Sequence, residues 1–63
     1  MRNVFQMTIA GRIRSLRIAL RKAGHPKVDE YDTTYLHYAA EECGTIEKAV
    51  DALFRVERIK RKK

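Results

Sequence analysis

Apolar side chains recur every three or four residues along the first part of the chain, until Gly24 and Pro26 interrupt the pattern. These spacings place side chains on one stripe of an α-helix. Gly24 can adopt the left-handed conformation that ends a helix, and Pro26 cannot continue one. We predict an amphipathic helix over residues 8–23, while residues 2–7 alternate like a strand and stay open between strand and helix. The stripe consists of Phe5, Ile9, Ile13, Leu16 and Leu20.

Capping residues and a second glycine mark two further helices. Asp32 and the two threonines after it each offer an N-cap for a helix over residues 34–43, and Gly44 can end that helix. Thr45 can cap a third helix over residues 46–59, whose apolar side chains form one broad face. The basic residues at its far end are expected to form a fraying helical tail. The predicted fold is all-α, a small three-helix bundle with a basic C-terminal tail.

The length of 63 residues allows one small helical domain over residues 1–63. A chain of this size buries only about 60% of the surface that its unfolded form exposes, so its core is marginal. We therefore expect a bound partner, or self-association as a homodimer, to support the fold. Hydrophobic residues make up 44% of the sequence, which separates it from disordered chains.

The formal net charge of +6 divides into three blocks. Residues 1–27 hold seven basic side chains and no acid, a charge of +7. Residues 28–54 hold seven acids and one lysine, a charge of −6, and residues 55–63 hold six bases and one acid, a charge of +5. This distribution indicates anionic partners for the two ends and attraction between the ends and the middle. The alternative is that the blocks neutralise one another within the fold.

The basic side chains of the first helix and the tail form the predicted binding site. Arginine and lysine at these positions can follow a phosphate backbone by Coulomb attraction and hydrogen bonds, with little dependence on base sequence. We predict a nucleic-acid-binding regulator or accessory protein, without a preference between DNA and RNA. The alternative is a solvated face, or arginines paired with the acidic block. The predicted site consists of Arg12, Arg14, Arg17, Arg21, Lys22, Arg58, Lys60 and Arg61.

Residues 36–55 have the pattern of two helices joined by a sharp turn. Ala40 permits close helix approach, Gly44 permits the turn, and Leu53 provides an inward apolar position. This stretch resembles the helix-turn-helix family, and the resemblance implies DNA binding. Its outward side chains include the acids Glu47 and Asp51, which repel phosphates. Contact with nucleic acid is therefore expected from the basic ends of the chain.

A glycine followed by an Ile-Glu-x-Ala-Val run that ends in two bulky apolar residues forms a second pattern over residues 38–54. It is similar to the last two helices of ubiquitin-associated (UBA-like) domains, and the resemblance implies a compact three-helix module that binds proteins. The second prediction is thus a protein-interaction module, an inhibitor or adaptor of a larger nucleic-acid machine. Its predicted surface combines acidic residues with an apolar edge and consists of Tyr38, Glu41, Glu42, Leu53 and Phe54.

The sequence contains no set of residues arranged for catalysis. Neither a Ser/His/Asp set nor a glycine-rich phosphate loop is present. His25 and His37 lack metal-ligand spacing, and the single cysteine, Cys43, excludes a zinc site built from several cysteines. We expect His25 in a loop, His37 exposed and Cys43 buried as a small hydrophobe. We predict a protein that is not an enzyme and that holds no metal and no cofactor.

No apolar run approaches the roughly 20 residues that span a membrane. We therefore expect no membrane span, and the single cysteine fits the reducing cytoplasm. A basic helix that lies on a membrane surface is a third alternative.

Overall fold

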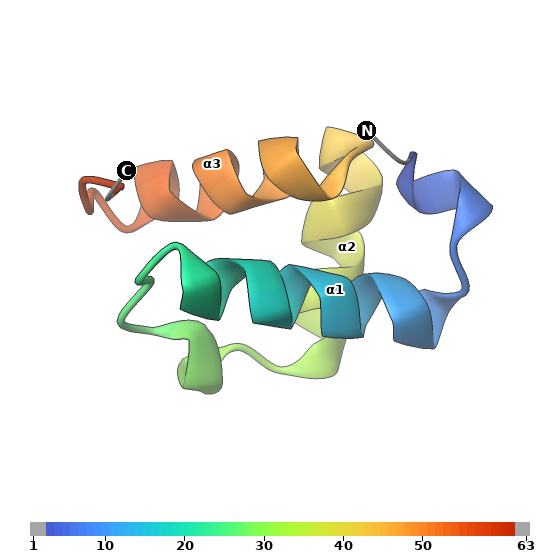
Figure 1. The fold of residues 1–63 in the computed structure, drawn as a ribbon, viewed down its shortest axis with the longest axis horizontal. Coiled ribbons are helices and arrows are strands. Elements are labelled where there is room, and N and C mark those ends of the chain that lie inside the picture. The colour runs from blue at the N-terminus through green and yellow to red at the C-terminus, as the bar shows by residue number, and fades with distance from the viewer. Residues whose placement is uncertain (1–2, 62–63) are drawn as a thin grey trace.

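A computed structural model describes residues 3–61 and shows an all-helical fold, which confirms the predicted class. α1 and α3 lie side by side and run in the same direction, and α2 crosses them from behind (Figure 1). The carboxyl ends of α1 and α3 therefore meet at one end of the molecule. The helices are α1 (Ile9–Lys22), α2 (Thr33–Cys43) and α3 (Ile46–Val56), and the short 3-10 turns are η1 (Val4–Gln6) and η2 (Val28–Glu30).

Each α-helix begins at a side chain that satisfies a free backbone N–H group. The hydroxyl of Thr8 accepts a hydrogen bond at the start of α1, and the carboxylate of Asp32 does so for α2. Thr45 caps α3 in the same way. Among the three side chains that the sequence offered as a cap for α2, Asp32 is the one used. Such caps contribute about 1 kcal/mol each.

α1 and α3 end in the same backbone motif, with a residue in the left-handed conformation. In α1 this residue is Gly24, with φ of 82°. In α3 it is Arg58, with φ of 56°, and the N–H of Ile59 then donates to the carbonyl of Phe54 over 3.0 Å. The prediction of a helix to residue 59 that frays into the tail is wrong. The chain turns at Arg58 because the turn returns Ile59 to the core, against which it packs.

Residues 3–7 form neither the strand nor the helix that the sequence left open, and residue 2 lies outside the described residues. Val4 begins the turn η1, is fully buried, and donates from its N–H to the carbonyl of Gly44 over 2.9 Å. Asn3 pairs with Thr45 in an isolated bridge. The first residues therefore pack against the junction between α2 and α3.

The core lies between the three helices and takes apolar side chains from each of them. Leu16 and Leu20 come from the predicted stripe, but Phe5 and Ile9 at its start are 60% and 56% exposed. The buried apolar residues are Val4, Leu16, Leu20, Val28, Leu36, Ala40, Ala49, Val50, Leu53 and Phe54.

Candidate functional site

Ion pairs connect the acidic middle of the chain to both basic ends. Arg21 lies 2.6 Å from Asp29 of the acidic middle, whereas Lys27 lies 3.2 Å from Glu57, the acid of the C-terminal block, and joins the two basic ends. These contacts neutralise part of the negative charge, so the exposed positive charge is more localised than the sequence indicates. Within residues 3–61, arginine also pairs with an acid in the contacts of Arg12 with Glu41 and of Arg61 with Glu47 and Asp51.

Arg12 does not belong to the exposed basic face that the sequence predicted. Its side chain is buried, and its guanidinium lies 3.5 Å from a carboxylate oxygen of Glu41 and 3.5 Å from the carbonyl of Met7. The guanidinium also lies over the ring of Phe5, 5.7 Å from its centroid. Arg12 therefore joins α1 to α2 and is not available to a phosphate backbone.

Arg61 is also engaged within the fold, contrary to its predicted role as a free anion contact. After the turn at Arg58 the tail folds back along α3, and the guanidinium of Arg61 donates to Glu47 over 2.6 Å and to Asp51. These hydrogen bonds raise the pKa of Arg61 above its usual value. Arg61, like Arg12, is thus paired with the acidic block, which is the alternative that the sequence left open.

Four exposed basic side chains at one end of the molecule make no ion pair with another described residue. Lys22 is the last residue of α1, and Arg55 lies in the last turn of α3. Because these helices run in the same direction, both side chains start from the same end (Figure 1). Arg58 and Lys60 follow α3 directly and are exposed. We call this set, Lys22, Arg55, Arg58 and Lys60, the helix-end cluster.

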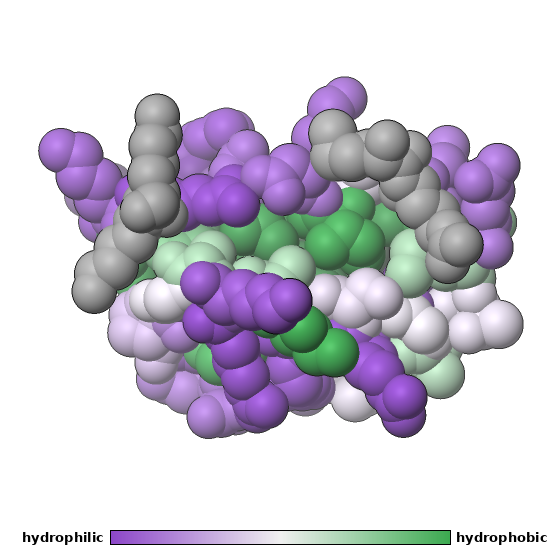
Figure 2. Space-filling model, in the orientation of Figure 1, coloured by the Kyte–Doolittle hydropathy of each residue, from purple (hydrophilic) through white to green (hydrophobic). Residues whose placement is uncertain are grey.

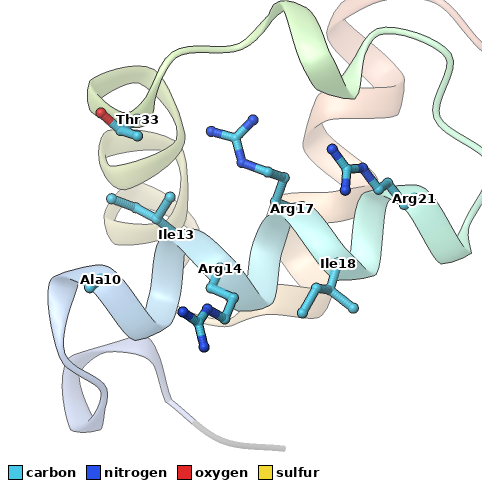
Figure 3. A pocket seen from close by; sticks show the side chains of 7 residues that line it. All are labelled: Ala10, Ile13, Arg14, Arg17, Ile18, Arg21 and Thr33. Atoms are coloured by element: carbon cyan, nitrogen blue, oxygen red, sulfur yellow. The ribbon is translucent and has the colours of Figure 1, made fainter.

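The other three predicted arginines border an open groove along α1. This α1 groove has a volume of about 410 Å³. Arg17 and Arg21 extend toward η2, whereas Arg14 and Ile18 project from the opposite side of the helix (Figure 3). The groove contains both apolar and cationic side chains, and its lining includes no acid. It is lined by Ala10, Ile13, Arg14, Arg17, Ile18, Arg21 and Thr33.

The arginines of the α1 groove differ in how firmly they are held. Arg17 donates to the carbonyl of Tyr31 over 3.4 Å, and Arg21 donates to Asp29 over 2.6 Å. Arg14 is exposed and makes no ion pair within residues 3–61. Two guanidiniums are thus positioned by the connector after α1, and one is free.

Apolar surface continues from the α1 groove toward the start of α1. Ile13 and Thr33 also line a neighbouring hollow, together with Ile9 and Tyr38. Ile18, Ile9 and Tyr38 are 48%, 56% and 58% exposed. On the face that α1 and α3 form, a strip of apolar surface runs between hydrophilic side chains above and below it (Figure 2).

The surface predicted for protein binding is only partly present. Tyr38, Glu41 and Glu42 are exposed on α2. Leu53 and Phe54 are 2% and 3% exposed, so the predicted apolar edge around them is wrong. Both side chains fill the core because the broad apolar face of α3 points at α1 and α2.

A buried histidine connects the end of α1 to the end of α3. His25 lies in a loop, as expected, but is only 4% exposed. Its Nδ1 accepts a hydrogen bond from the N–H of Lys27, so Nε2 carries the proton. Nε2 lies 3.1 Å from the carbonyl oxygen of Leu53 and 3.2 Å from the hydroxyl of Tyr31. The sequence held no local sign of these contacts, because they join residues far apart in the chain.

Tyr31 extends this network to the surface. Its hydroxyl donates to Glu57 over 3.1 Å. Burial, and then the hydrogen bond to Glu57, raise the pKa of Tyr31 above its usual value. The hydrogen bonds from Lys27 and from Tyr31 hold the pKa of Glu57 below its usual value. The network joins the loop after α1 to the end of α3, the two segments that carry the helix-end cluster.

The remaining candidates for chemistry are dispersed. His37, expected to be exposed, is partly buried and lies 3.8 Å from Glu41. Cys43 is partly buried and packs against the core. Within residues 3–61, no group of three or more histidine, cysteine or acidic side chains is placed to hold a metal ion. None of the helices described here is long and apolar enough to cross a membrane.

Comparison of the chain with protein-family models, with curated proteins and with solved structures finds no match.

Proposed function

We propose that the protein binds the phosphate backbone of nucleic acid through the helix-end cluster, as a non-enzymatic regulator or accessory factor in the cytoplasm. The observation that carries the proposal is the division of the charges. The fold pairs Arg12, Arg21, Lys27 and Arg61 with acids and leaves the cluster exposed at one end. The acid beside each paired cation offsets part of its attraction for an external anion.

The proposed binding site therefore differs from the site predicted from the sequence and contains fewer residues. Lys22, Arg58 and Lys60 remain in it, and Arg55 joins them. Arg14 and Arg17 also make no ion pair within residues 3–61, but they lie along the α1 groove and not at the helix ends. Cations near the carboxyl ends of α1 and α3 also interact favourably with the helix dipoles, so a structural role for the cluster must be separated from a binding role. A measurement of affinity together with stability separates the two.

The pair formed by α2 and α3 is not the proposed contact. Gly44, with φ of 84°, makes the sharp turn that the helix-turn-helix and UBA-like resemblances require. The outward positions of the pair carry Glu42, Glu47 and Asp51, and the last two hold Arg61. The proposal therefore assigns this pair to packing, and it assigns no sequence preference to the protein.

A salt titration of binding to a labelled DNA duplex, with single-stranded RNA in parallel, tests the proposal. If four cations contact phosphates, the logarithm of the affinity falls with the logarithm of the salt concentration with a slope of about −3.6. Between about 50 and 200 mM salt the affinity then falls by about 100-fold. Absence of binding at the lowest salt concentration contradicts the proposal.

A variant that neutralises the whole cluster completes this test. Lys22→Gln, Arg55→Gln and Lys60→Gln remove charge, and Arg58→Asn removes charge while keeping a residue that tolerates the left-handed conformation. The variant is expected to lose the salt dependence. Its unfolding midpoint in urea shows whether the fold is intact. A folded variant that retains the affinity of the wild type overturns the proposal.

A further inference from the structure

We propose that the α1 groove binds an amphipathic, acidic helix of a partner protein. The inference concerns a different surface from the helix-end cluster, and none of the cluster residues lines the groove. Arg14, Arg17 and Arg21, which the sequence grouped with the nucleic-acid contacts, then serve protein recognition.

The apolar part of the groove indicates a partner with apolar side chains. Ile13 and Ile18 line it with Ala10, and Ile18 is 48% exposed. A nucleic-acid duplex offers phosphates to the arginines, but its charged backbone offers little apolar surface to cover these isoleucines. A protein segment can satisfy both kinds of side chain, so the lining favours a protein over a nucleic acid.

The length and direction of the groove fit a helix. From Ala10 to Arg21 the groove follows α1 for about 16 Å, at the rise of an α-helix. A partner helix of about three turns covers this length. Helices that bind in grooves place apolar anchors at spacings of three and four residues.

The charges around the groove define the partner further. Each side of the groove carries cationic and apolar side chains together: Arg17 and Arg21 extend toward η2, and Arg14 projects with Ile18 from the opposite side of α1 (Figure 3). The hydrogen bond to the carbonyl of Tyr31 holds Arg17 without neutralising its charge, which lowers the entropy lost when it binds a partner. Each guanidinium keeps further N–H donors for carboxylates. The complementary helix therefore carries acidic residues next to its apolar side chains.

Three synthetic peptides of one length test the inference by fluorescence anisotropy. The first carries leucines at spacings of three and four residues with glutamates beside them, the second is its scrambled sequence, and the third replaces the glutamates with lysines. The first peptide is expected to bind at least about tenfold more tightly than either of the others. Equal binding of the scrambled peptide, or no binding of the first peptide at about 1 mM, overturns the proposal.

Variants of exposed residues locate the binding surface without disturbing the core. Arg14→Glu and Ile18→Ser are expected to weaken binding of the first peptide by about fivefold or more. Lys48→Glu makes the same charge change as Arg14→Glu on α3, outside the groove, and serves as the matched control. If Lys48→Glu weakens binding as much as Arg14→Glu does, the effect is one of net charge and the proposal is wrong.

Two-dimensional amide NMR spectra distinguish the other occupants. The acidic peptide is expected to shift amide signals of residues 10–21 and Thr33, and vesicles rich in phosphatidylserine are expected to leave them unchanged. Vesicles or a second copy of this chain that shift the same signals, while the peptide does not, overturn the proposal. Arg14 lies outside the helix-end cluster, so Arg14→Glu is expected to weaken peptide binding and to leave the salt slope of duplex binding unchanged. The two measurements therefore separate this inference from the proposed function.

Discussion

The imidazole of His25 donates from Nε2 to the carbonyl oxygen of Leu53, 3.1 Å away, and thereby fixes the loop after α1 to the last turns of α3. The ring also packs edge-on against Phe54, with 4.6 Å between centroids. The contact joins the two segments that carry the cluster, because Lys22 lies shortly before the loop and Arg55 lies two residues after Leu53. The binding surface proposed here thus depends on a buried polar contact.

Replacing His25 with alanine is expected to destabilise the protein by about 2–4 kcal/mol, because it leaves a cavity and an unpaired buried carbonyl. Tyr31→Phe removes only the hydroxyl of the network and is expected to cost about 1 kcal/mol. Unfolding in urea, followed by circular dichroism, measures both values. A loss for His25→Ala no larger than that for Tyr31→Phe contradicts the assigned role.

The stabilising contribution of Glu57 is expected to be lost in acid. Its pKa is lower in the folded protein than in the unfolded chain, because Lys27 and Tyr31 hydrogen-bond to the carboxylate. This stabilisation is complete above the unfolded pKa, which is about 4.3, and is lost as the pH falls through the lower folded pKa. Urea midpoints of the wild type and of Glu57→Gln between about pH 6 and 2 test this. The urea midpoint of Glu57→Gln is expected to depend less on pH than that of the wild type. Identical pH profiles of the two proteins contradict a stabilising contact at Glu57.

Arg58→Gly is expected to stabilise the protein by about 1 kcal/mol, because glycine adopts the left-handed conformation without strain. The same change removes one cation of the helix-end cluster, so duplex affinity at low salt is expected to fall. Lys60→Gly, in the segment after α3, removes the same charge without the conformational gain and is the control. An Arg58→Gly variant that is less stable than the wild type contradicts this prediction.

Alanine variants of Arg12 and Arg14 are expected to differ in stability, although the two residues are only two positions apart. Arg12→Ala removes a buried side chain and its contact with Glu41, at an expected cost of about 1–3 kcal/mol. Arg14→Ala changes an exposed side chain and is expected to stay within about 0.5 kcal/mol of the wild type. Thermal unfolding of the two variants provides the comparison, and equal losses contradict the burial of Arg12.

Local signals allowed the helices to be predicted from the sequence. Thr45 and Gly24 act through neighbouring backbone groups, so their roles follow from short-range chemistry. Arg12 was misassigned because the basic residues were grouped by charge. Its position four residues before Leu16 places it on the buried stripe, and this spacing is the signal that identifies it. Leu53 and Phe54 likewise belong to the apolar face of the third helix.

Contacts between distant residues could not be predicted. The return of Arg61 to Glu47 depends on the turn at Arg58, a residue type that rarely adopts a left-handed conformation. The α1 groove depends on how the connector folds beside α1, since Thr33 completes its lining. Neither arrangement leaves a periodic pattern in the sequence.

The central claim, that unpaired cations rather than net charge bind the anion, is tested by two double variants of equal charge. Arg55→Gln with Lys60→Gln removes two cluster cations, whereas Arg21→Gln with Arg61→Gln removes two cations that are paired within the fold. In a salt titration of duplex binding, the first variant is expected to make the slope shallower by about 1.8, and the second to leave it unchanged. Equal changes in slope for the two variants would contradict the account.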